Sequence, residues 1–205
     1  MASTAKLFGV LVSIILFSTK AFAENTEVLY QTCAACHGDK GQGNQSLKAP
    51  AIAGQHVWYI ERQLKHFIDG TRGSQSTDVG GQQMRASVSQ LNKDTDVPAL
   101  AAYIAGMPSL SLPDAVKGDL MNGSRYYQAK CGACHGGKAE GNASFNAPKL
   151  SNLHSEYLMQ QMKNFINGNR GSHPEDTLGK QMSMMARIVN EKELADIVYY
   201  ISQQK

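Results

Sequence analysis

Two short motifs carry the residues whose chemistry is most specific in this sequence. Cys33-Ala34-Ala35-Cys36-His37 and Cys131-Gly132-Ala133-Cys134-His135 both have the form C-x-x-C-H. This spacing is typical of c-type haem, because two thiols can form thioethers with the two vinyl groups and the next histidine then lies under the iron. The sequence therefore predicts two covalently attached haem c groups. The candidate attachment residues are Cys33, Cys36, Cys131 and Cys134, and the candidate iron ligands are His37 and His135.

Two other uses of paired cysteines compete with this interpretation. A thioredoxin-like dithiol has the same cysteine spacing, but it belongs to a βαβ context and does not require the histidine. A zinc site built from both pairs is the second alternative, although such pairs usually lie closer together and the histidines would have no role. The histidine that follows both pairs favours haem attachment.

The two motifs belong to a long internal repeat. When the sequence is shifted by 98 residues, 25 of the 52 positions from Cys33 to Met84 are identical without a gap. Unrelated sequences would share roughly three, at typical residue usage. The identical pairs include Gly43/Gly141, Pro50/Pro148, His56/His154, Tyr59/Tyr157, Arg72/Arg170 and Met84/Met182. We therefore expect two copies of one structural unit.

The repeat also indicates the sixth iron ligands. Met84 follows His37 by 47 residues, and Met182 follows His135 by the same 47 residues. Methionine sulfur is a soft ligand that favours Fe(II) and raises the reduction potential. The second copy holds further methionines that have no methionine counterpart in the first: Met159, Met162, Met184 and Met185. Met84 and Met182 are thus the candidate ligands.

Other roles for these repeated residues stay open. His56 and His154 also repeat, so ligation of each iron by two histidines is an alternative. Met84 and Met182 could instead fill the core, as methionine often does.

Two repeated prolines lie 13 residues after the motif histidines. Pro50 and Pro148 could hold a loop whose carbonyl accepts the second N–H of the histidine, and such a bond would orient the ring. An ordinary turn proline is the alternative.

The elements that must position these residues are expected to be helices. Apolar residues recur at helical spacing from His56 to Gly70 and from His154 to Gly168. Further helices are predicted over 28–32 and 119–130, near Asp96 with Pro98 in the first turn, and after a capping sequence at Asn190. No segment alternates long enough to predict a strand, so the fold class is all-α.

The first 23 residues have the features of a secretory signal peptide. Lys6 precedes an apolar stretch, and Ala21-Phe22-Ala23 is a small-x-small cleavage site. The stretch is too short for an ordinary membrane span, although a retained anchor is the alternative. The mature protein is therefore expected outside the cytoplasm.

Composition excludes some classes of partner. The chain of 205 residues is 18% charged and 42% apolar, which is typical of a globular protein. Removal of Lys6 and Lys20 with the leader leaves 18 basic and 17 acidic residues, a formal charge of +1. Without a basic run, a nucleic-acid partner has no electrostatic support.

These features resemble the cytochrome c4 family. The resemblance rests on the tandem C-x-x-C-H motifs, the following Ala-Pro segments, Gly54-Gln55-His56, Gln63-Leu64 and the Met-Arg of the first copy. It implies two tandem cytochrome c-like domains, and it assigns the axial positions to His37, Met84, His135 and Met182. The second copy departs from the pattern at Asn152-Leu153-His154, which puts contacts to the propionates of its haem in doubt.

The expected organisation and function follow from the repeat and the resemblance. We expect a signal peptide (1–23), a first domain (24–106), a linker (107–113) and a second domain (114–205). The resemblance implies a periplasmic, non-enzymatic carrier that exchanges electrons with respiratory redox proteins, passes them on toward a terminal oxidase and associates loosely with membranes. No small-molecule substrate is expected. The alternatives are a haem subunit of a dehydrogenase or oxidase complex, and a di-haem peroxidase.

Overall fold

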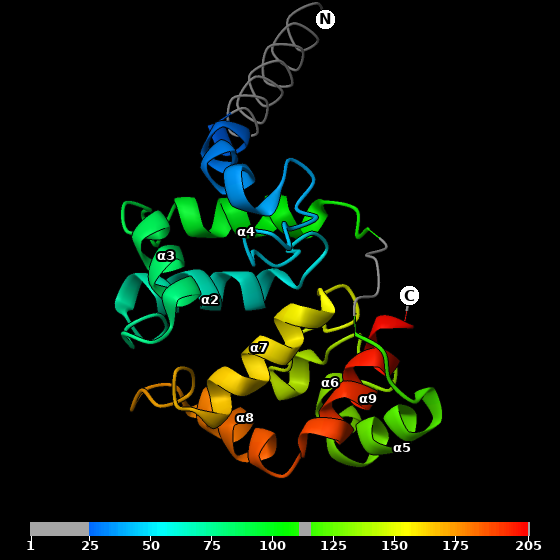
Figure 1. The fold of residues 1–205 in the computed structure, drawn as a ribbon. Helices are drawn as coiled ribbons and strands as arrows, with labels where there is room; N and C mark the ends of the chain where they lie inside the picture. The colour runs from blue at the N-terminus through cyan, green and yellow to red at the C-terminus, as the bar shows by residue number, and fades with distance from the viewer. Residues whose placement is uncertain (1–24, 111–115, 205) are drawn as a thin grey trace, which may run out of the picture.

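The computed structural model describes residues 25–110 and 116–204. They form two helical domains, one above the other in Figure 1. Within the described ranges there is no strand, only two isolated β-bridges at equivalent places in the repeat, Asn44–Ala49 and Asn142–Ala147. The prediction of an all-α fold with two copies of one unit is confirmed. The predicted signal peptide (1–23) and residues 111–113 of the predicted linker lie outside the described residues.

The helices of the two domains occur in matching order. In the first domain they are residues 25–37, α2 (Val57–Asp69), α3 (Val79–Val88) and α4 (Asp96–Gly106). In the second domain they are α5 (Leu120–Lys130), α6 (Gly132–His135), the 3-10 turn η1 (Ala143–Phe145), α7 (Ser155–Ile166), α8 (Thr177–Arg187) and α9 (Glu191–Ser202).

Helices α2 and α7 confirm the predicted helical periodicity. The buried face of α2 consists of Ile60, Leu64 and Phe67, which are spaced three or four residues apart. Gly70 ends α2 in the left-handed conformation (φ 78°), which glycine adopts without a steric penalty. The two helices face each other where the domains meet (Figure 1).

Helices α3 and α8, which carry Met84 and Met182, were not predicted from the sequence. Adjacent glycines, Gly80 and Gly81, lower the intrinsic helix propensity of α3. The aspartates that precede the two helices stabilise their N-termini by capping. Asp78 accepts a hydrogen bond from the amide of Gly81, and Asp176 accepts one from the amide of Gly179.

Each domain has its own hydrophobic core, closed by its first and last helices. The first core consists of Tyr30, Ile60, Leu64, Phe67, Val88, Val97, Leu100, Ala101 and Ile104. The second consists of Tyr127, Ala139, Leu158, Val189, Leu194, Ile197, Val198 and Ile201. Helices α5 and α9 lie side by side, as do α2 and α4 (Figure 1). The cores do not share residues, so each C-x-x-C-H motif belongs to a separate packing unit.

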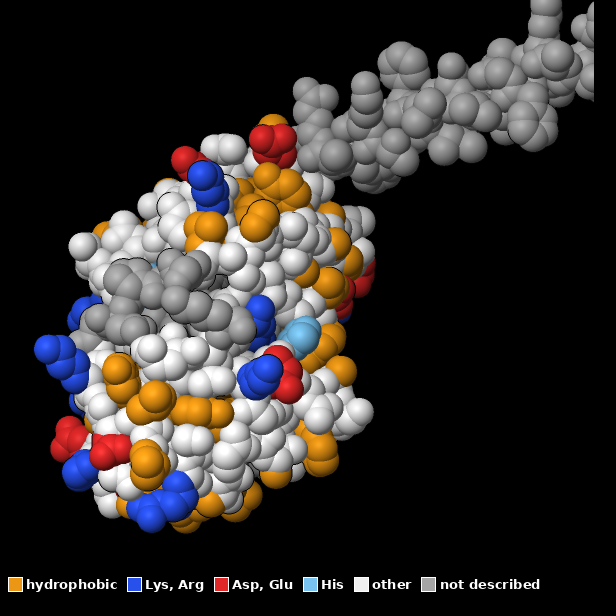
Figure 2. Space-filling model, turned by 90° about the vertical axis from the view of Figure 1, so that its right-hand side faces the viewer, with side chains coloured by type: hydrophobic (Ala, Val, Ile, Leu, Met, Phe, Trp, Pro, Cys, Tyr) orange, Lys and Arg blue, Asp and Glu red, His pale blue; other side chains and the backbone are white. Residues whose placement is uncertain are grey.

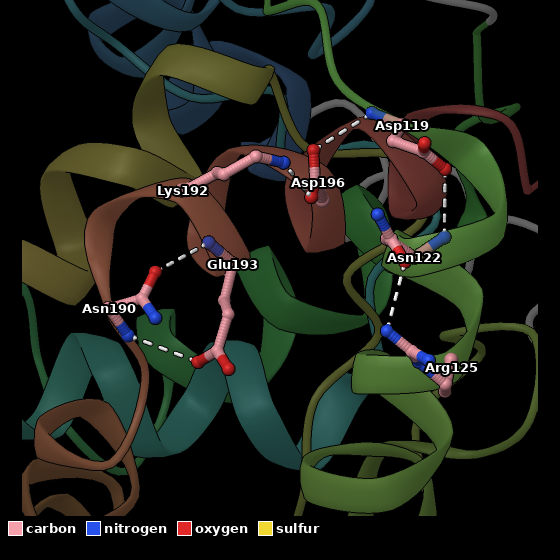
Figure 3. Close-up of polar contacts among 7 residues, drawn as sticks. All are labelled: Asp119, Asn122, Arg125, Asn190, Lys192, Glu193 and Asp196. Atoms are coloured by element: carbon pink, nitrogen blue, oxygen red, sulfur yellow. Dashed lines mark hydrogen bonds and ion pairs between the residues drawn. The ribbon is translucent and has the colours of Figure 1, made fainter.

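Polar contacts fix α5 against α9 in the second domain (Figure 3). The carboxylate of Asp196 is 3% exposed; it accepts from the amide of Asp119 at 2.8 Å and pairs with Lys192 at 3.0 Å. These two hydrogen bonds lower the pKa of Asp196, the bond from Asp119 more than that from Lys192. Asn190 and Glu193 form the predicted capping box at the start of α9.

The described surface carries charges of both signs. Figure 2 shows small groups of hydrophobic side chains between Lys, Arg, Asp and Glu residues, and neither sign dominates this face. Among the described residues, no helix is both long and apolar enough to cross a membrane.

The capping box yields a prediction for the second domain. Asn190→Ala removes an acceptor that binds the amide of Glu193, so we expect a loss of about 1 kcal/mol in unfolding free energy. The matched control is Thr95→Ala, because Thr95 precedes α4 without a side-chain cap bond. Denaturant unfolding of both variants measures the difference, and equal losses would contradict the assigned role of Asn190.

Candidate functional site

The four cysteines have the same arrangement in both domains. In each motif the first cysteine is half-buried (Cys33, Cys131) and the second is exposed (Cys36, Cys134), and all four thiols are free. Cys33 packs against the first core and Cys131 against the second. Each domain therefore offers its own pair of thiols at the edge of its own core.

The environment of the thiols argues against a reactive dithiol. Burial raises the pKa of Cys33, and it raises the pKa of Cys131 to about 11 although Lys130 acts in the opposite direction. Redox dithiols instead need a lowered thiol pKa. In the part of the chain that the structure describes, no three His, Cys, Asp or Glu side chains form a metal-binding group, so the zinc alternative has no ligand set there.

The two motif histidines are held by the same hydrogen bond. His37 Nδ1 lies 2.8 Å from the carbonyl oxygen of Pro50, and His135 Nδ1 lies 2.9 Å from that of Pro148. Since a carbonyl only accepts, Nδ1–H is the donor in both cases. The predicted role of the proline carbonyls is confirmed, and the alternative of plain turn prolines is wrong.

This bond leaves Nε2 of each histidine as the nitrogen with a free lone pair. Both side chains are 6% exposed, and burial lowers the pKa of His37 and of His135 although the bond to proline raises it. A neutral imidazole with Nδ1 protonated is the form that ligates iron through Nε2.

A buried tyrosine fixes the turn that follows each histidine. Tyr30 donates to the carbonyl of Gly38 at 2.7 Å, and Tyr127 donates to that of Gly136 at 2.7 Å. Burial raises the pKa of Tyr30 to about 12, so its hydroxyl stays protonated as a donor. Sequence analysis missed these tyrosines because they lie outside the ungapped part of the repeat.

The candidate methionine ligands are half-buried on α3 and α8. Met84 packs against the first core together with Cys33. In the second domain, Met182 precedes Ser183, whose hydroxyl donates to the carbonyl of Phe165 at 2.7 Å and so fixes this turn of α8. The neighbouring methionines differ, since Met184 is 62% exposed and Met185 is 38% exposed. Met159 and Met162 pack against the second core.

The repeated histidines His56 and His154 lie where the domains meet. His56 Nε2–H donates across the interface to the carbonyl of Glu140 at 2.9 Å. A β-carbon added to Gly141 would lie 2.7 Å from His56 Nε2, and one added to Gly43 would lie 2.6 Å from His154 Cε1. Each histidine therefore faces the repeated glycine of the other domain.

Six repeated polar residues form a central interface cluster: Tyr59, Gln63 and Arg72 from the first domain, and Tyr157, Gln161 and Arg170 from the second. Arg72 donates to Gln63 at 2.7 Å and, across the interface, to Tyr157 at 3.1 Å and Gln161 at 3.0 Å. Arg170 reproduces the pattern with Gln161 at 2.9 Å, Tyr59 at 3.0 Å and Gln63 at 3.0 Å. The interface thus has pseudo-twofold symmetry. The signal for this cluster was present in the repeat, as identical polar residues that the haem motif does not need.

The interface is asymmetric where the two copies differ in sequence: the first copy has Gly54-Gln55-His56, and the second has Asn152-Leu153-His154. Gln55 pairs through both ends of its amide with the backbone of Lys149, accepting at 3.1 Å and donating at 2.9 Å. Its counterpart in the repeat, Leu153, packs against the second core.

The donor sets of both domains fit a covalently bound haem. Each domain offers two free thiols separated by two intervening residues, an imidazole whose Nε2 is free, and a half-buried thioether. Thioether formation uses the thiols, and an imidazole with a methionine sulfur is a known axial pair for haem iron.

The chain is similar to known proteins over most of its length. The family model described as cytochrome c matches the chain twice, over residues 23–108 and 120–205. The chain is 30% identical over 182 residues to cytochrome c4 of Thiocapsa roseopersicina, covering 82% of this chain and 85% of that protein. Its fold is similar to the solved structure of Acidithiobacillus ferrooxidans cytochrome c4, with a TM-score of 0.69, 26% identity, and coverage of 84% of this chain and 98% of that one.

A fourth comparison concerns a protein that serves a dehydrogenase. The chain is 29% identical over 157 residues to a thiosulfate dehydrogenase electron acceptor of Thiomonas intermedia (strain K12), covering 70% of this chain and 66% of that protein.

The contact between His56 and Gly141 yields a prediction. Gly141 has φ +85°, and an added β-carbon would also lie 2.7 Å from the amide of Lys149. We expect Gly141→Ala to lower the unfolding free energy by about 2 kcal/mol or more, because left-handed backbone and steric overlap both disfavour alanine there. Gly80→Ala is the control, since its β-carbon meets no atom within 4 Å. Urea titrations that gave equal stabilities for both variants would contradict this role of Gly141.

Proposed function

Because this chain belongs to the cytochrome c4 family, with one covalently attached haem in each of its two cytochrome c domains, we propose that it carries electrons between respiratory redox proteins in the periplasm. The observation that carries the proposal is the repeated donor set. In both domains an imidazole with a free Nε2 is followed 47 residues later by a half-buried methionine.

We infer the role of each side chain from this set. Cys33 and Cys36 attach the first haem, and Cys131 and Cys134 the second. His37 and Met84 would hold the iron in the first domain, and His135 and Met182 would hold it in the second. When bound, haem supplies one-electron chemistry at its iron. The bonds to Pro50 and Pro148 hold the imidazoles in the tautomer that ligation requires.

A candidate methionine ligand in both domains favours a carrier over an enzyme. A di-haem peroxidase needs one iron with an open or displaceable position for its substrate. This chain offers a half-buried methionine at the same position in both domains, which supports protection of both irons.

The partners are proposed by class. The family resemblance favours delivery to a terminal oxidase, and the amino-terminal sequence favours export. A second candidate, a haem subunit or dedicated acceptor of a dehydrogenase, is supported by the similarity to the thiosulfate dehydrogenase electron acceptor. Isolation of the native protein separates the two candidates, since a free carrier is recovered alone and a subunit is recovered with a fixed partner.

The axial ligands yield a prediction that separates the two domains. Met84→Ala should open the sixth position of the first haem and lower its reduction potential, because the sulfur that favours Fe(II) is lost. Met182→Ala should do the same for the second haem. Each variant should keep about half of the near-infrared sulfur-to-iron band of the ferric native protein. After reduction, each should bind about one equivalent of carbon monoxide.

The matched control is Met184→Ala, an equal change at a 62% exposed methionine on the same helix. It should keep the full band and bind no carbon monoxide. A full band in Met182→Ala, or carbon monoxide binding and peroxide turnover by the native protein, would overturn the assignment.

Haem attachment yields a second prediction. Each domain has about 90 residues, and a core of that size is marginal without the contacts of the macrocycle. We expect the double variant Cys131→Ser, Cys134→Ser to leave the second domain largely unfolded, with a clear loss of helical circular dichroism. A cooperative, native-like helical signal from the second domain of this variant would refute the prediction.

A further inference from the structure

Helix α8 presents apolar side chains to solvent. Met184 is 62% exposed, Met185 is 38% exposed, and Ile188, directly after the helix, is 55% exposed. Because they are one, three and four residues apart, these three side chains form a stripe along one side of the helix, here called the α8 face. The other side of α8 is buried, for example at Ala186. Helix α8 lies at the lower edge of the second domain in Figure 1.

Two basic residues border the α8 face. Lys180 precedes Met184 by four residues and Arg187 follows it by three, so both lie along one edge of the stripe. Both are exposed, and neither takes part in an ion pair within 4 Å among the residues that the structure describes. Helix α8 contains no Asp or Glu, and the nearest exposed carboxylates in the sequence, Glu175 and Glu191, lie beyond its two ends. The α8 face thus combines an apolar stripe with a positive edge.

The first domain has no equivalent of this face. At the 98-residue shift, the counterparts of Met184, Met185 and Ile188 are Ala86, Ser87 and Gln90, and those of Lys180 and Arg187 are Gln82 and Ser89. These counterparts are exposed as well, and aspartates cap α3 and α8 at equivalent positions. A feature needed to pack or ligate haem would occur in both copies. The α8 face therefore serves a molecule that meets the second domain alone.

The α8 face is also close to a candidate iron ligand. Met182 lies on the same helix, one turn before Met185, and its side chain is half-buried. A partner that covers the face is therefore separated from the sulfur of Met182 by about 10 Å, the width of one helix. Such a short separation suits the exchange of electrons with the second haem.

The charges of the face favour a foreign protein over a second copy of this chain. In a symmetric dimer the same patch lies on both sides of the contact, so Lys180 and Arg187 would meet equal charges. A lipid surface is also disfavoured, because two basic residues and three apolar side chains are few for stable binding to a membrane. Methionine and arginine are both enriched in protein–protein interfaces.

We propose that the α8 face is the docking surface for an electron-transfer protein that presents an apolar patch bordered by carboxylates. The proposal rests on the electron-carrier function proposed above and adds the surface and the chemistry of the partner. In the docked complex one electron passes from the second haem to the one-electron centre of the partner, and no bond forms or breaks. The opposite charges steer the encounter, and the apolar stripe holds the complex briefly.

The first test is an NMR titration of the fully reduced holoprotein, labelled with ¹³C at its methionine methyl groups. The probe is a small blue-copper protein in its Cu(I) form, made in two versions that carry either aspartates or lysines beside its apolar patch. The Met184 and Met185 signals should shift, with a dissociation constant about fivefold lower for the aspartate version, as expected for two exposed ion pairs. Met121 on α5, which is 83% exposed, is the internal control and should not shift. Equal affinities for the two versions, or shifts at Met121 alone, would overturn the proposal.

The second test measures electron transfer to the Cu(II) form of the aspartate probe by stopped flow. The double variant Met184→Gln, Ile188→Gln should need about tenfold more probe for half-maximal rate, because the apolar contact is lost. Its limiting rate should not change, since Met182 is retained. The matched control is Ala86→Gln on the counterpart helix α3, which should behave like the native protein. Equal effects of the two variants would contradict the assignment of the face to the second domain.

A third comparison isolates the positive edge. Arg187→Gln should reduce the preference for the aspartate version over the lysine version of the probe, and high salt should do the same in the native protein. The control is Arg125→Gln, an exposed arginine on α5 that contacts Asn122 and Tyr126, and it should keep the preference. A preference that survives Arg187→Gln unchanged would refute the role of this edge.

The same NMR signals identify any other occupant. Shifts of Met184 that depend on the concentration of the protein alone would assign the face to a second copy, and shifts caused by phosphatidylglycerol vesicles would assign it to a membrane. Either result would overturn the proposal. A native protein without the sulfur-to-iron band would count against the proposed function, whereas a protein that has the band but shows no shift would count against the α8 face.

Discussion

A hydrogen bond that occurs once in each domain is the interaction on which the rest of the site depends. Nδ1–H of the motif histidine donates to a proline carbonyl 13 residues later, which fixes the tautomer and closes a loop. That loop also meets the other domain, since His56 binds the carbonyl of Glu140, between His135 and Pro148. The element that orients the imidazole is therefore the element that the neighbouring domain touches. Lys149, the residue after Pro148, also binds Gln55 across the interface.

Duplication explains how the same repeated segment can orient the motif histidine and also contact the other domain. In a symmetric dimer the same patch appears on both subunits, and each residue meets the counterpart of its partner. The arginine, glutamine and tyrosine residues of the central interface cluster follow that rule within a single chain. The covalent connection then allows the two halves to diverge, because a change in one copy is not imposed on the other. Gln55 and Leu153 are such a change: one binds the opposite backbone, and the other packs in its own core.

The sequence predicted local chemistry well and long-range geometry poorly. Covalent spacing dictates what Cys33, Cys36 and His37 can do together, and a capping box is a signal of only four residues. Both features could therefore be predicted from the sequence. Helix α3 was missed because Gly80 and Gly81 oppose helix formation, and its N-terminus depends on the bond that the amide of Gly81 donates to Asp78. The contact between Arg72 and Tyr157 joins residues 85 positions apart, and no periodicity records such a pair. Identity at these polar positions was visible, but it did not distinguish a role at the interface from a role at the haem.

The polar contacts between the domains fix the position of one candidate site relative to the other. The central contacts between the domains are hydrogen bonds from arginine, glutamine and histidine side chains. Apolar contacts are non-directional and tolerate sliding, whereas hydrogen bonds weaken steeply when their angle or length changes. Polar interfaces within a chain are often weak, but the chain connection keeps the halves at high effective concentration. The two domains can therefore hold one specific orientation without a large apolar contact, which is the geometry that electron exchange between two fixed sites requires.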